Sequence, residues 1–272
     1  MDKYFRFKHF AVANELSSQK VGTDGVLLGA WVRLHGDEQH ILDVGTGTGV
    51  IALMLAQRTD EALRVSAGGI AGREHFFASE TRYQSIGAQS TTIIGIDIDA
   101  PSAEEAAANF KASPWAGRMA AFCGDFRGLG SDDSHPLKFL AFPYDLIVSN
   151  PPYFVDSLKA PDHRRSDARH SDSLPYSDLI EGALKNLAPD GRLAIILPSL
   201  EAERFESQAC GAGLLPCRRC RVSTISGREP VRTLLELSRT AAICEESTLA
   251  IQDSAGYTDE YKALTKDFYL KF

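Results

Sequence analysis

Short apolar runs alternate with amphipathic segments along most of the chain. Runs of strand length occupy residues 40–44, 92–99, 119–123, 144–149 and 191–197. Segments with apolar residues at helical spacing occupy residues 50–57, 103–112, 174–187 and 201–212, and an aromatic-rich one occupies 257–270. Because parallel strands need a crossover between them, this alternation predicts an α/β fold with a doubly wound, mostly parallel sheet.

Two stretches depart from the simple alternation. Residues 215–223 and 231–239 alternate apolar and polar positions, which predicts an antiparallel C-terminal hairpin. Residues 61–91 separate the first helix from the second strand and are rich in glycine, serine and alanine, so we expect a mobile surface insertion there. The 272 residues should otherwise form a single domain, with residues 1–35 preceding the first strand.

The amino-acid composition argues against a disordered protein, a membrane protein and a zinc protein. A hydrophobic content of 44% and a charged content of 24% are globular averages, which excludes wholesale disorder. No apolar stretch reaches the roughly 18 residues of a membrane span, and five cysteines are an odd count in a long chain. The single C-x-x-C pair, Cys217 and Cys220, lacks the further ligands of a zinc site. We expect a cytoplasmic protein without membrane association or a bound metal.

A glycine-rich turn directly follows the first predicted strand. The segment from Asp43 to Gly49 has glycine at positions 45, 47 and 49, which lets the backbone turn tightly and a ligand lie against it. The dinucleotide pattern G-x-G-x-x-G fails because Val50 stands at its last position. A dinucleotide or a turn without a ligand remains an alternative. The pattern D-x-G-x-G-x-G, with Asp43, Gly45, Gly47 and Gly49, resembles motif I of class I S-adenosylmethionine-dependent methyltransferases. The resemblance implies a Rossmann-like sheet of seven strands, with S-adenosyl-L-methionine as the cofactor.

Acidic residues after the second and third predicted strands suit a nucleoside ligand. Rossmann-type sites place a carboxylate at the end of the second strand to accept the ribose hydroxyls. Asp97 is the better candidate for that role, because Asp99 is placed to cap the next helix. After the third strand, Asp125 can accept the adenine amino group and Phe126 can pack on the base. A solvated loop aspartate is the alternative for Asp125.

The fourth predicted strand ends in Asn150-Pro151-Pro152-Tyr153. A double proline cannot continue a strand ladder, so it fixes a stiff projection at the sheet edge where doubly wound folds bind substrates. The block matches the N-P-P-Y motif of methyltransferases that modify exocyclic or amide nitrogens, whose delocalised lone pair makes them poor nucleophiles. The Asn150 oxygen and the Pro151 carbonyl can accept the two N–H groups and orient the nitrogen, while Tyr153 stacks on the flat acceptor. Asn150 also borders the predicted cofactor site.

Further blocks resemble the bacterial tRNA-Val adenine-N6 methyltransferases. The most distinctive is Lys20-Val-Gly-Thr-Asp-Gly25, and others are residues 5–10, 57–58, 113–115 and 261–269. The resemblance covers nearly the whole chain outside residues 61–91, which are not part of the family pattern. It implies methylation of the adenine adjoining the anticodon. It also implies that residues 1–35 cover the cofactor and acceptor, with Thr23 contacting the cofactor near its methionine end.

Three other functions stay open from the sequence. The acceptor could be a release-factor glutamine or another nitrogen in RNA or DNA, and a non-catalytic RNA- or nucleotide-binding module is a further alternative. The intact N-P-P-Y block argues against the module. Release-factor enzymes usually carry an additional helical N-terminal domain, and we expect residues 1–35 to be too short for one.

RNA binding requires a local concentration of positive charge in this acidic chain. Its formal net charge is 29 − 36 = −7. The segment after N-P-P-Y carries Lys159, Arg164, Arg165 and Arg169, next to the predicted acceptor pocket. We expect these side chains to contact tRNA phosphates or bases. The basic and aromatic residues 3–10 are a second candidate.

Overall fold

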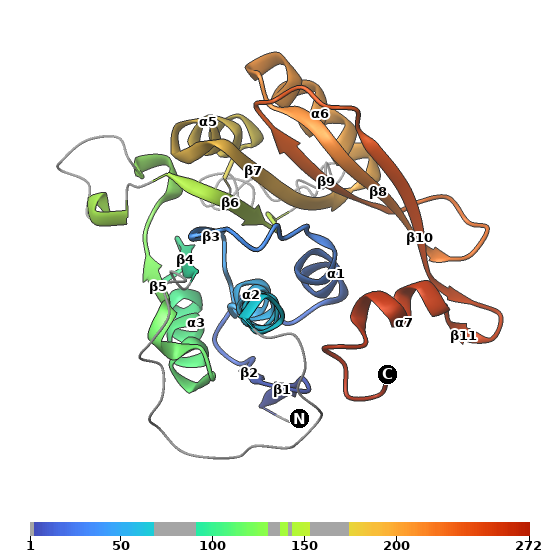
Figure 1. The fold of residues 1–272 in the computed structure, drawn as a ribbon, viewed down its shortest axis with the longest axis horizontal. Coiled ribbons are helices and arrows are strands. Elements are labelled where there is room, and N and C mark those ends of the chain that lie inside the picture. The colour runs from blue at the N-terminus through green and yellow to red at the C-terminus, as the bar shows by residue number, and fades with distance from the viewer. Residues whose placement is uncertain (1–2, 68–90, 130–136, 141–142, 153–173) are drawn as a thin grey trace, which may run out of the picture.

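The computed structural model describes residues 3–67, 91–129, 137–140, 143–152 and 174–272 (Figure 1). The strands are β1 (Tyr4–Arg6), β2 (Ala11–Ala13), β3 (His40–Val44), β4 (Thr92–Asp97), β5 (Met119–Cys123), β6 (Tyr144–Ser149), β7 (Leu187–Pro198), β8 (Leu215–Ile225), β9 (Arg232–Ser238), β10 (Glu245–Asp253) and β11 (Gly256–Tyr257). The α-helices are α1 (Thr23–Trp31), α2 (Val50–Ala67), α3 (Ala100–Ala112), α5 (Tyr176–Asn186), α6 (Ser199–Ala212) and α7 (Asp259–Thr265). Short 3-10 turns cover Ala116–Arg118, Phe126–Gly128 and Lys138–Leu140.

The main sheet has nine strands in the order β11-β10-β8-β9-β7-β6-β3-β4-β5. Strands β5, β4, β3, β6 and β7 are mutually parallel, and β9 lies antiparallel between β7 and β8. The doubly wound, mostly parallel sheet with an antiparallel C-terminal hairpin is thereby confirmed. The seven expected strands are extended by β10, which pairs parallel to β8, and by the short β11. Strands β1 and β2 form a separate antiparallel ribbon.

Helices cover both faces of the parallel part of the sheet. Figure 1 shows α5 and α6 on one side and α1, α2 and α3 on the other. Successive strand residues point to opposite faces, so Ile41 packs in the core under α1 and α2 whereas Leu42 packs in the core under α5 and α6. Each face of the sheet therefore has its own apolar core.

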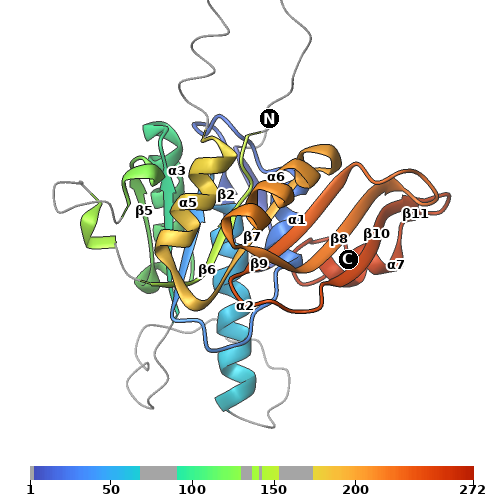
Figure 2. The same cartoon turned by 90° about the horizontal axis from the view of Figure 1, so that it is seen from above.

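Two predicted elements differ most in extent from the observed ones. Helix α2 continues to Ala67 rather than ending at residue 57, so the first seven residues of the expected insertion are helical. Figure 2 shows α2 running well past the edge of the sheet. The rest of that insertion, residues 68–90, lies outside the described residues. The expected C-terminal helix over residues 257–270 is wrong in its bounds, because Tyr257 belongs to β11 and Thr258 caps a shorter helix α7.

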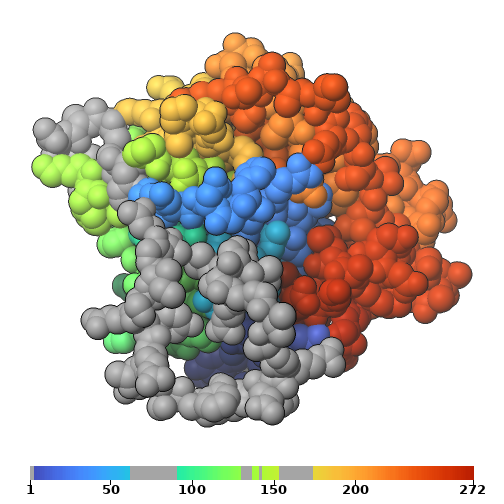
Figure 3. Space-filling view, viewed as in Figure 1, coloured from blue at the N-terminus to red at the C-terminus, as the bar shows by residue number. Residues whose placement is uncertain are grey.

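The two ends of the described chain pack together. Phe7 forms a β-bridge with Tyr269, and the Lys8 ammonium donates hydrogen bonds to the carbonyls of Lys266 and Phe272 at 2.5 and 2.6 Å. Figure 3 shows the C-terminal segment against the N-terminal residues on this face. None of the described helices is long and apolar enough to cross a membrane.

Candidate active site

The glycine turn between β3 and α2 uses backbone conformations that favour glycine at all three predicted positions. Gly45, Gly47 and Gly49 have φ angles of 69°, 56° and 80°. A Cβ atom on Gly49 would lie 2.4 Å from Cε1 of Phe110, so the turn packs tightly against α3 there. A Cβ atom on Gly45 would meet no described atom within 4 Å. The turn is therefore closed on the α3 side and open beside Gly45.

Asp43 is fully buried beneath this turn. Its Oδ2 accepts hydrogen bonds from the Thr46 hydroxyl at 2.8 Å and from the Ala52 N–H at 3.3 Å. Its Oδ1 has no hydrogen-bond partner among the described residues. Burial raises the pKa of Asp43 to about 7, although the Thr46 hydrogen bond opposes the shift. The carboxyl thus has an unused acceptor atom.

The two acidic residues after β4 have different partners. Asp99 caps α3, since its Oδ2 accepts hydrogen bonds from the N–H and the hydroxyl of Ser102 at 3.1 and 2.6 Å. Asp97 faces the glycine turn, where its Oδ2 accepts the Gly47 N–H at 2.8 Å. Burial raises the pKa of Asp97 above its usual range. Asp97 therefore lies beside the turn, at the position predicted for a ribose ligand.

Asp125 and Phe126 lie after β5 and already have protein partners. The Asp125 carboxylate forms an ion pair with the Arg127 guanidinium, whose Nε lies 3.0 and 2.8 Å from its two oxygens. Phe126 is 4% exposed, and a Cβ atom on Gly182 of α5 would lie 2.3 Å from its ring. Contacts of Asp125 and Phe126 with adenine stay predictions.

Strand β6 brings the start of the N-P-P-Y block next to the glycine turn. Ser149 is the register partner of Val44 in β3, and its hydroxyl donates to the Val44 carbonyl at 2.8 Å. Asn150 is half-buried, Pro151 is buried and Pro152 is exposed. Because β4 and β6 flank β3 on opposite sides, this edge is the topological switch point where doubly wound sheets bind ligands. Tyr153 and the basic residues Lys159, Arg164, Arg165 and Arg169 lie outside the described residues.

The N-terminal segment reaches the same edge through residues that lie outside every sequence motif. A Cβ atom on Gly47 would lie 3.4 Å from the Ser17 hydroxyl and 3.9 Å from the Gln19 carbonyl. Thr23, the predicted contact, is exposed at the first turn of α1, and Asp24 pairs with Arg232 at 2.9 Å. Ser17 and Gln19 carry no motif, so only their position over the turn identifies them.

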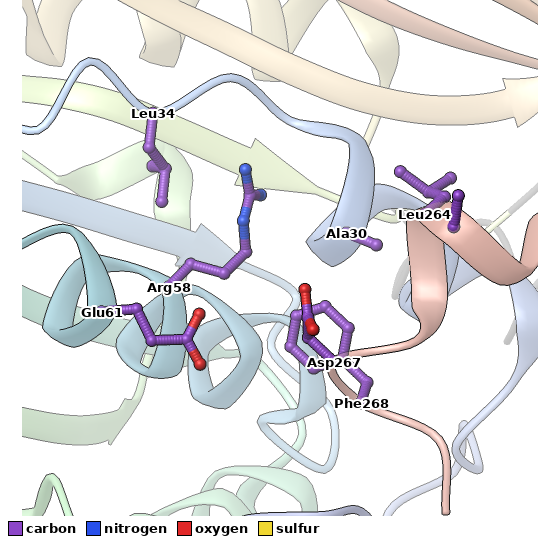
Figure 4. Close-up of a pocket in the computed structure, with 8 residues that line it drawn as sticks. Ala30, Leu34, Arg58, Glu61, Leu264, Asp267 and Phe268 are labelled. Carbon is purple, nitrogen blue, oxygen red and sulfur yellow. The ribbon is translucent and has the colours of Figure 1, made fainter. Parts of the chain in front are cut away.

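The cavity in Figure 4 lies elsewhere in the molecule. Its volume is about 350 Å³, and Arg58 and Glu61 of α2 line it together with Asp267 near the C-terminus. Arg58 is eight residues along α2 from Val50, or ~12 Å from the glycine turn. This cavity is therefore separate from the switch point. Within the described part of the chain, no three His, Cys, Asp or Glu side chains are grouped closely enough to hold a metal ion.

Comparison with solved structures supports the fold alone. The chain is similar to a predicted O-methyltransferase from Agrobacterium tumefaciens, with a TM-score of 0.60, 14% identity and coverage of 90% of this chain and 96% of that one. It is also similar to a methyltransferase from Pyrococcus furiosus, with a TM-score of 0.50, 17% identity and coverage of 85% and 90%. The sheet is thus an α/β, Rossmann-like sheet.

Comparison with curated proteins identifies the family, although no protein-family model matches the chain. A protein of Bacteroides fragilis is 40% identical over 269 residues, which cover 98% of both chains. One of Parabacteroides distasonis is 41% identical over 272 residues, again with 98% of both chains covered. One of Flavobacterium psychrophilum is 39% identical over 268 residues, which cover 98% of this chain and 99% of that one. All three are named tRNA1(Val) (adenine(37)-N6)-methyltransferase. The chain therefore belongs to the tRNA1(Val) (adenine(37)-N6)-methyltransferase family.

Proposed function

We propose that this protein transfers a methyl group from S-adenosyl-L-methionine to N6 of adenine 37 in tRNA1(Val), in the cytoplasm. The observation that carries this proposal is the pairing of Val44 with Ser149. It makes Gly45 and Asn150 neighbours at one sheet edge, so a donor site and a nitrogen-orienting site adjoin. The names of the relatives supply the acceptor.

The described residues fit the cofactor. An open space adjoins Gly45, a buried Asp43 oxygen has no described partner, and the Asp97 carboxylate lies at the end of β4. We assign Asp43, Gly45, Gly47, Gly49 and Thr23 to the methionine half. Asp97 would accept the ribose hydroxyls, and Asp125 with Phe126 would border the adenine. When bound, the cofactor supplies an electrophilic methyl group on a sulfonium sulfur.

The start of the N-P-P-Y block orients the accepting nitrogen. The Asn150 side-chain oxygen and the Pro151 carbonyl accept its two N–H groups, which localises the lone pair and aims it at the methyl group. Pro152 keeps the backbone from continuing β6, and Tyr153 stacks on the adenine. These residues act by orientation and electrostatics, so the reaction needs no strong base.

The tRNA must present adenine 37 outside its base stack. An anticodon-loop base is already partly unpaired, so the energetic cost of extruding it is low. Lys159, Arg164, Arg165 and Arg169 follow Asn150 closely in sequence, and we assign them to tRNA phosphates. Positive charge in this segment would offset the acidic average of the chain.

The proposed function is tested by methylation of total tRNA with labelled S-adenosylmethionine, followed by identification of the modified nucleoside. N6-methyladenosine is the expected product. The Asn150→Ala variant should lose about 10²-fold or more in turnover, the scale of one oriented catalytic hydrogen bond, yet bind the cofactor like the parent in calorimetry. A label found in release-factor glutamine but not in tRNA would refute the proposed acceptor.

A further inference from the structure

One face of α3 is turned toward the N-terminal segment that crosses the glycine turn. Ser102, Glu105 and Asn109 lie on this face at positions i, i+3 and i+7, and all three are buried. Their partners are residues 13–19, which we name the N-terminal strap. The strap runs from the end of β2 to the residues that lie over Gly47.

Glu105 binds three consecutive backbone N–H groups of the strap. Its Oε1 accepts those of Glu15 and Leu16 at 2.6 and 2.9 Å, and its Oε2 accepts that of Ser17 at 2.8 Å. Burial of the side chain raises its pKa, but these hydrogen bonds and the nearby Lys20 outweigh burial and hold the pKa of Glu105 below its usual range. The bound form is therefore the carboxylate, which makes charge-assisted hydrogen bonds.

Asn109 and Ser102 link the strap to both parts of the candidate cofactor site. Asn109 accepts the Ala13 N–H at 2.7 Å and donates to the carbonyls of Ala13 and Thr48, the latter at 2.9 Å within the glycine turn. The Ser102 hydroxyl lies 3.2 Å from the Ser17 hydroxyl and 2.6 Å from the Asp99 carboxylate. The N–H of Asp99 in turn donates to Asp97. The strap is thus linked through Asn109 to the turn, and through Ser102 and Asp99 to Asp97.

We propose that Glu105 is a positioning residue for the cofactor. By fixing the backbone of residues 15–17, it holds Ser17 and Gln19 over Gly47 as one wall of the S-adenosylmethionine site. The inference rests on the proposed function, because it takes the glycine turn to be the cofactor site. Glu105 does not itself touch the cofactor, so its effect should appear in cofactor affinity and not in the methyl-transfer step.

The Glu105→Gln substitution tests the positioning role without changing the size or the burial of the side chain. The side chains of Glu105→Gln and the parent have nearly the same shape. The amide oxygen of the glutamine can still accept two of the three N–H groups. The NH2 group of the glutamine would point at the third N–H group, and two donors cannot form a hydrogen bond. Glu104→Gln is the matched control, because Glu104 is exposed on the same helix and makes no described contact with the strap.

Three readouts test the inference. Calorimetry gives the Kd for S-adenosylmethionine without tRNA, deuterium exchange gives the stability of the strap, and tRNA methylation gives KM and kcat. Glu105→Gln should raise Kd and KM for the cofactor about tenfold, the scale of removing one hydrogen bond to a charged group. Its kcat at saturating cofactor should stay within about twofold of the parent. Amide exchange should accelerate in residues 13–19 but not in β3 to β5, and Glu104→Gln should match the parent throughout.

Two results would overturn the inference. One is faster exchange in the strap with an unchanged Kd, which would mean that the strap is no part of the cofactor site. The other is a fall in kcat at unchanged KM. If Glu105→Gln does not fold, Glu105→Asp keeps the charge with a shorter reach, and a parent-like Kd together with faster strap exchange would overturn the inference equally.

The design separates this inference from the proposed function. If the parent binds S-adenosylmethionine but does not methylate tRNA, the proposed acceptor fails, while calorimetry and exchange still decide the role of Glu105. If the parent does not bind S-adenosylmethionine at all, the proposed function and this inference both fail.

Discussion

At the residue scale, the glycines of the turn meet two different constraints. Gly45 and Gly49 both have positive φ angles, which cost a non-glycine residue roughly 1–2 kcal/mol. Only Gly49 also faces a neighbour, the ring of Phe110. Besides its place in the turn, Gly49 therefore serves the packing of α2 on α3, whereas Gly45 faces only the space that we assign to the cofactor.

Alanine substitutions should separate these two roles. Gly49→Ala should lower the free energy of unfolding by about 3 kcal/mol, because backbone strain and overpacking against Phe110 add. Gly45→Ala should cost only about 1–2 kcal/mol but weaken S-adenosylmethionine binding about tenfold or more. Urea unfolding and calorimetry measure the two effects. Gly117→Ala is the control, since its Cβ atom would meet no atom of the described residues within 4 Å and its φ angle is not positive. Equal stability losses for Gly45 and Gly49 would contradict the assignment.

Asp43 should make the stability of the cofactor-free protein depend on pH. Burial raises its pKa from 3.8 to about 7, so between these values the folded state holds a proton that the unfolded state has released. Stability must then fall as pH rises through this window, by up to about 1.4 kcal/mol per pH unit. Asp43→Asn removes the titration, so its unfolding free energy relative to the parent should increase from about pH 5 to about pH 7. A difference that stays constant over this range in urea titrations would exclude the raised pKa.

Local motifs identify some site residues in advance and miss others for a physical reason. Several site residues lie at or next to the ends of strands, namely Asp43, the three glycines and Asn150. Their order in the chain is therefore enough to predict that they lie at the sheet edge. The partners of the strap are found only through the fold, since Glu105 and Ser17 are 88 residues apart in sequence. A buried glutamate in an alanine-rich helix gives no local signal of the three backbone groups that it binds.

At the element scale, one buried carboxylate joins several parts of the sheet. Glu236 of β9 is 1% exposed and accepts hydrogen bonds from the Arg33 N–H at 2.6 Å and from the side chains of Arg192 and Arg218, both at 3.1 Å. Arg218 also lies over the Trp31 ring, 4.1 Å from its centroid. Glu236 therefore connects β7, β8 and β9 with the end of α1.

Removing the charge of Glu236 should destabilise the folded protein. Glu236→Gln should lower the free energy of unfolding by about 2 kcal/mol or more, because it leaves the buried Arg192 and the half-buried Arg218 without a full partner. Glu246→Gln is the control. Glu246 lies in the exposed first part of β10 and pairs with Arg219 and Arg221 of β8, where solvent screens the ion pairs. Chemical denaturation compares the two variants. Equal and small losses of unfolding free energy in the two variants would mean that the buried cluster contributes no more to stability than a surface ion pair.

The elements that sequence patterns predict best are the buried ones. Strands β3 and β6 are buried along most of their length and have the predicted bounds, because buried parallel strands are short apolar runs between polar residues. The edge strand β5 also has the predicted bounds, although only its first residue is buried. Strand β10 was missed, since its first four residues are exposed and polar. The sequence predicts a shorter helix α2 than the structure has, because the apolar pattern weakens where the helix passes the edge of the sheet. Elements that pack against the core on a single side therefore have the weakest apolar pattern in the sequence.

At the scale of the whole molecule, substrate binding must overcome an unfavourable net charge. The chain carries a formal charge of −7, so long-range attraction does not draw a polyanion to it. Several of its arginines are already neutralised by carboxylates, among them Arg33, Arg219 and Arg232. The segment that carries Lys159 and Arg164 is the sequence-based candidate for the compensating charge.

Neutralising Arg164, Arg165 and Arg169 together should weaken tRNA binding and flatten its salt dependence. The slope of log affinity against log salt should fall by about 0.7–0.9 for each phosphate that the variant no longer neutralises, because fewer counterions are released. Filter binding over a salt series measures the slope, and calorimetry should show unchanged cofactor affinity. A parent-like slope would exclude this segment and direct attention to residues 3–9.

Adenine 37 of tRNA1(Val) should receive the methyl group on N6. Two transcripts of this tRNA, one with adenine and one with guanine at position 37, should be incubated with the protein and labelled S-adenosylmethionine, with the Asn150→Ala variant as the blank. We expect N6-methyladenosine at position 37 of the first transcript, no methylation of the second, and about 10²-fold or more slower labelling by the variant. Equal methylation of both transcripts, or labelling of the first by the variant at the rate of the parent, would contradict this expectation.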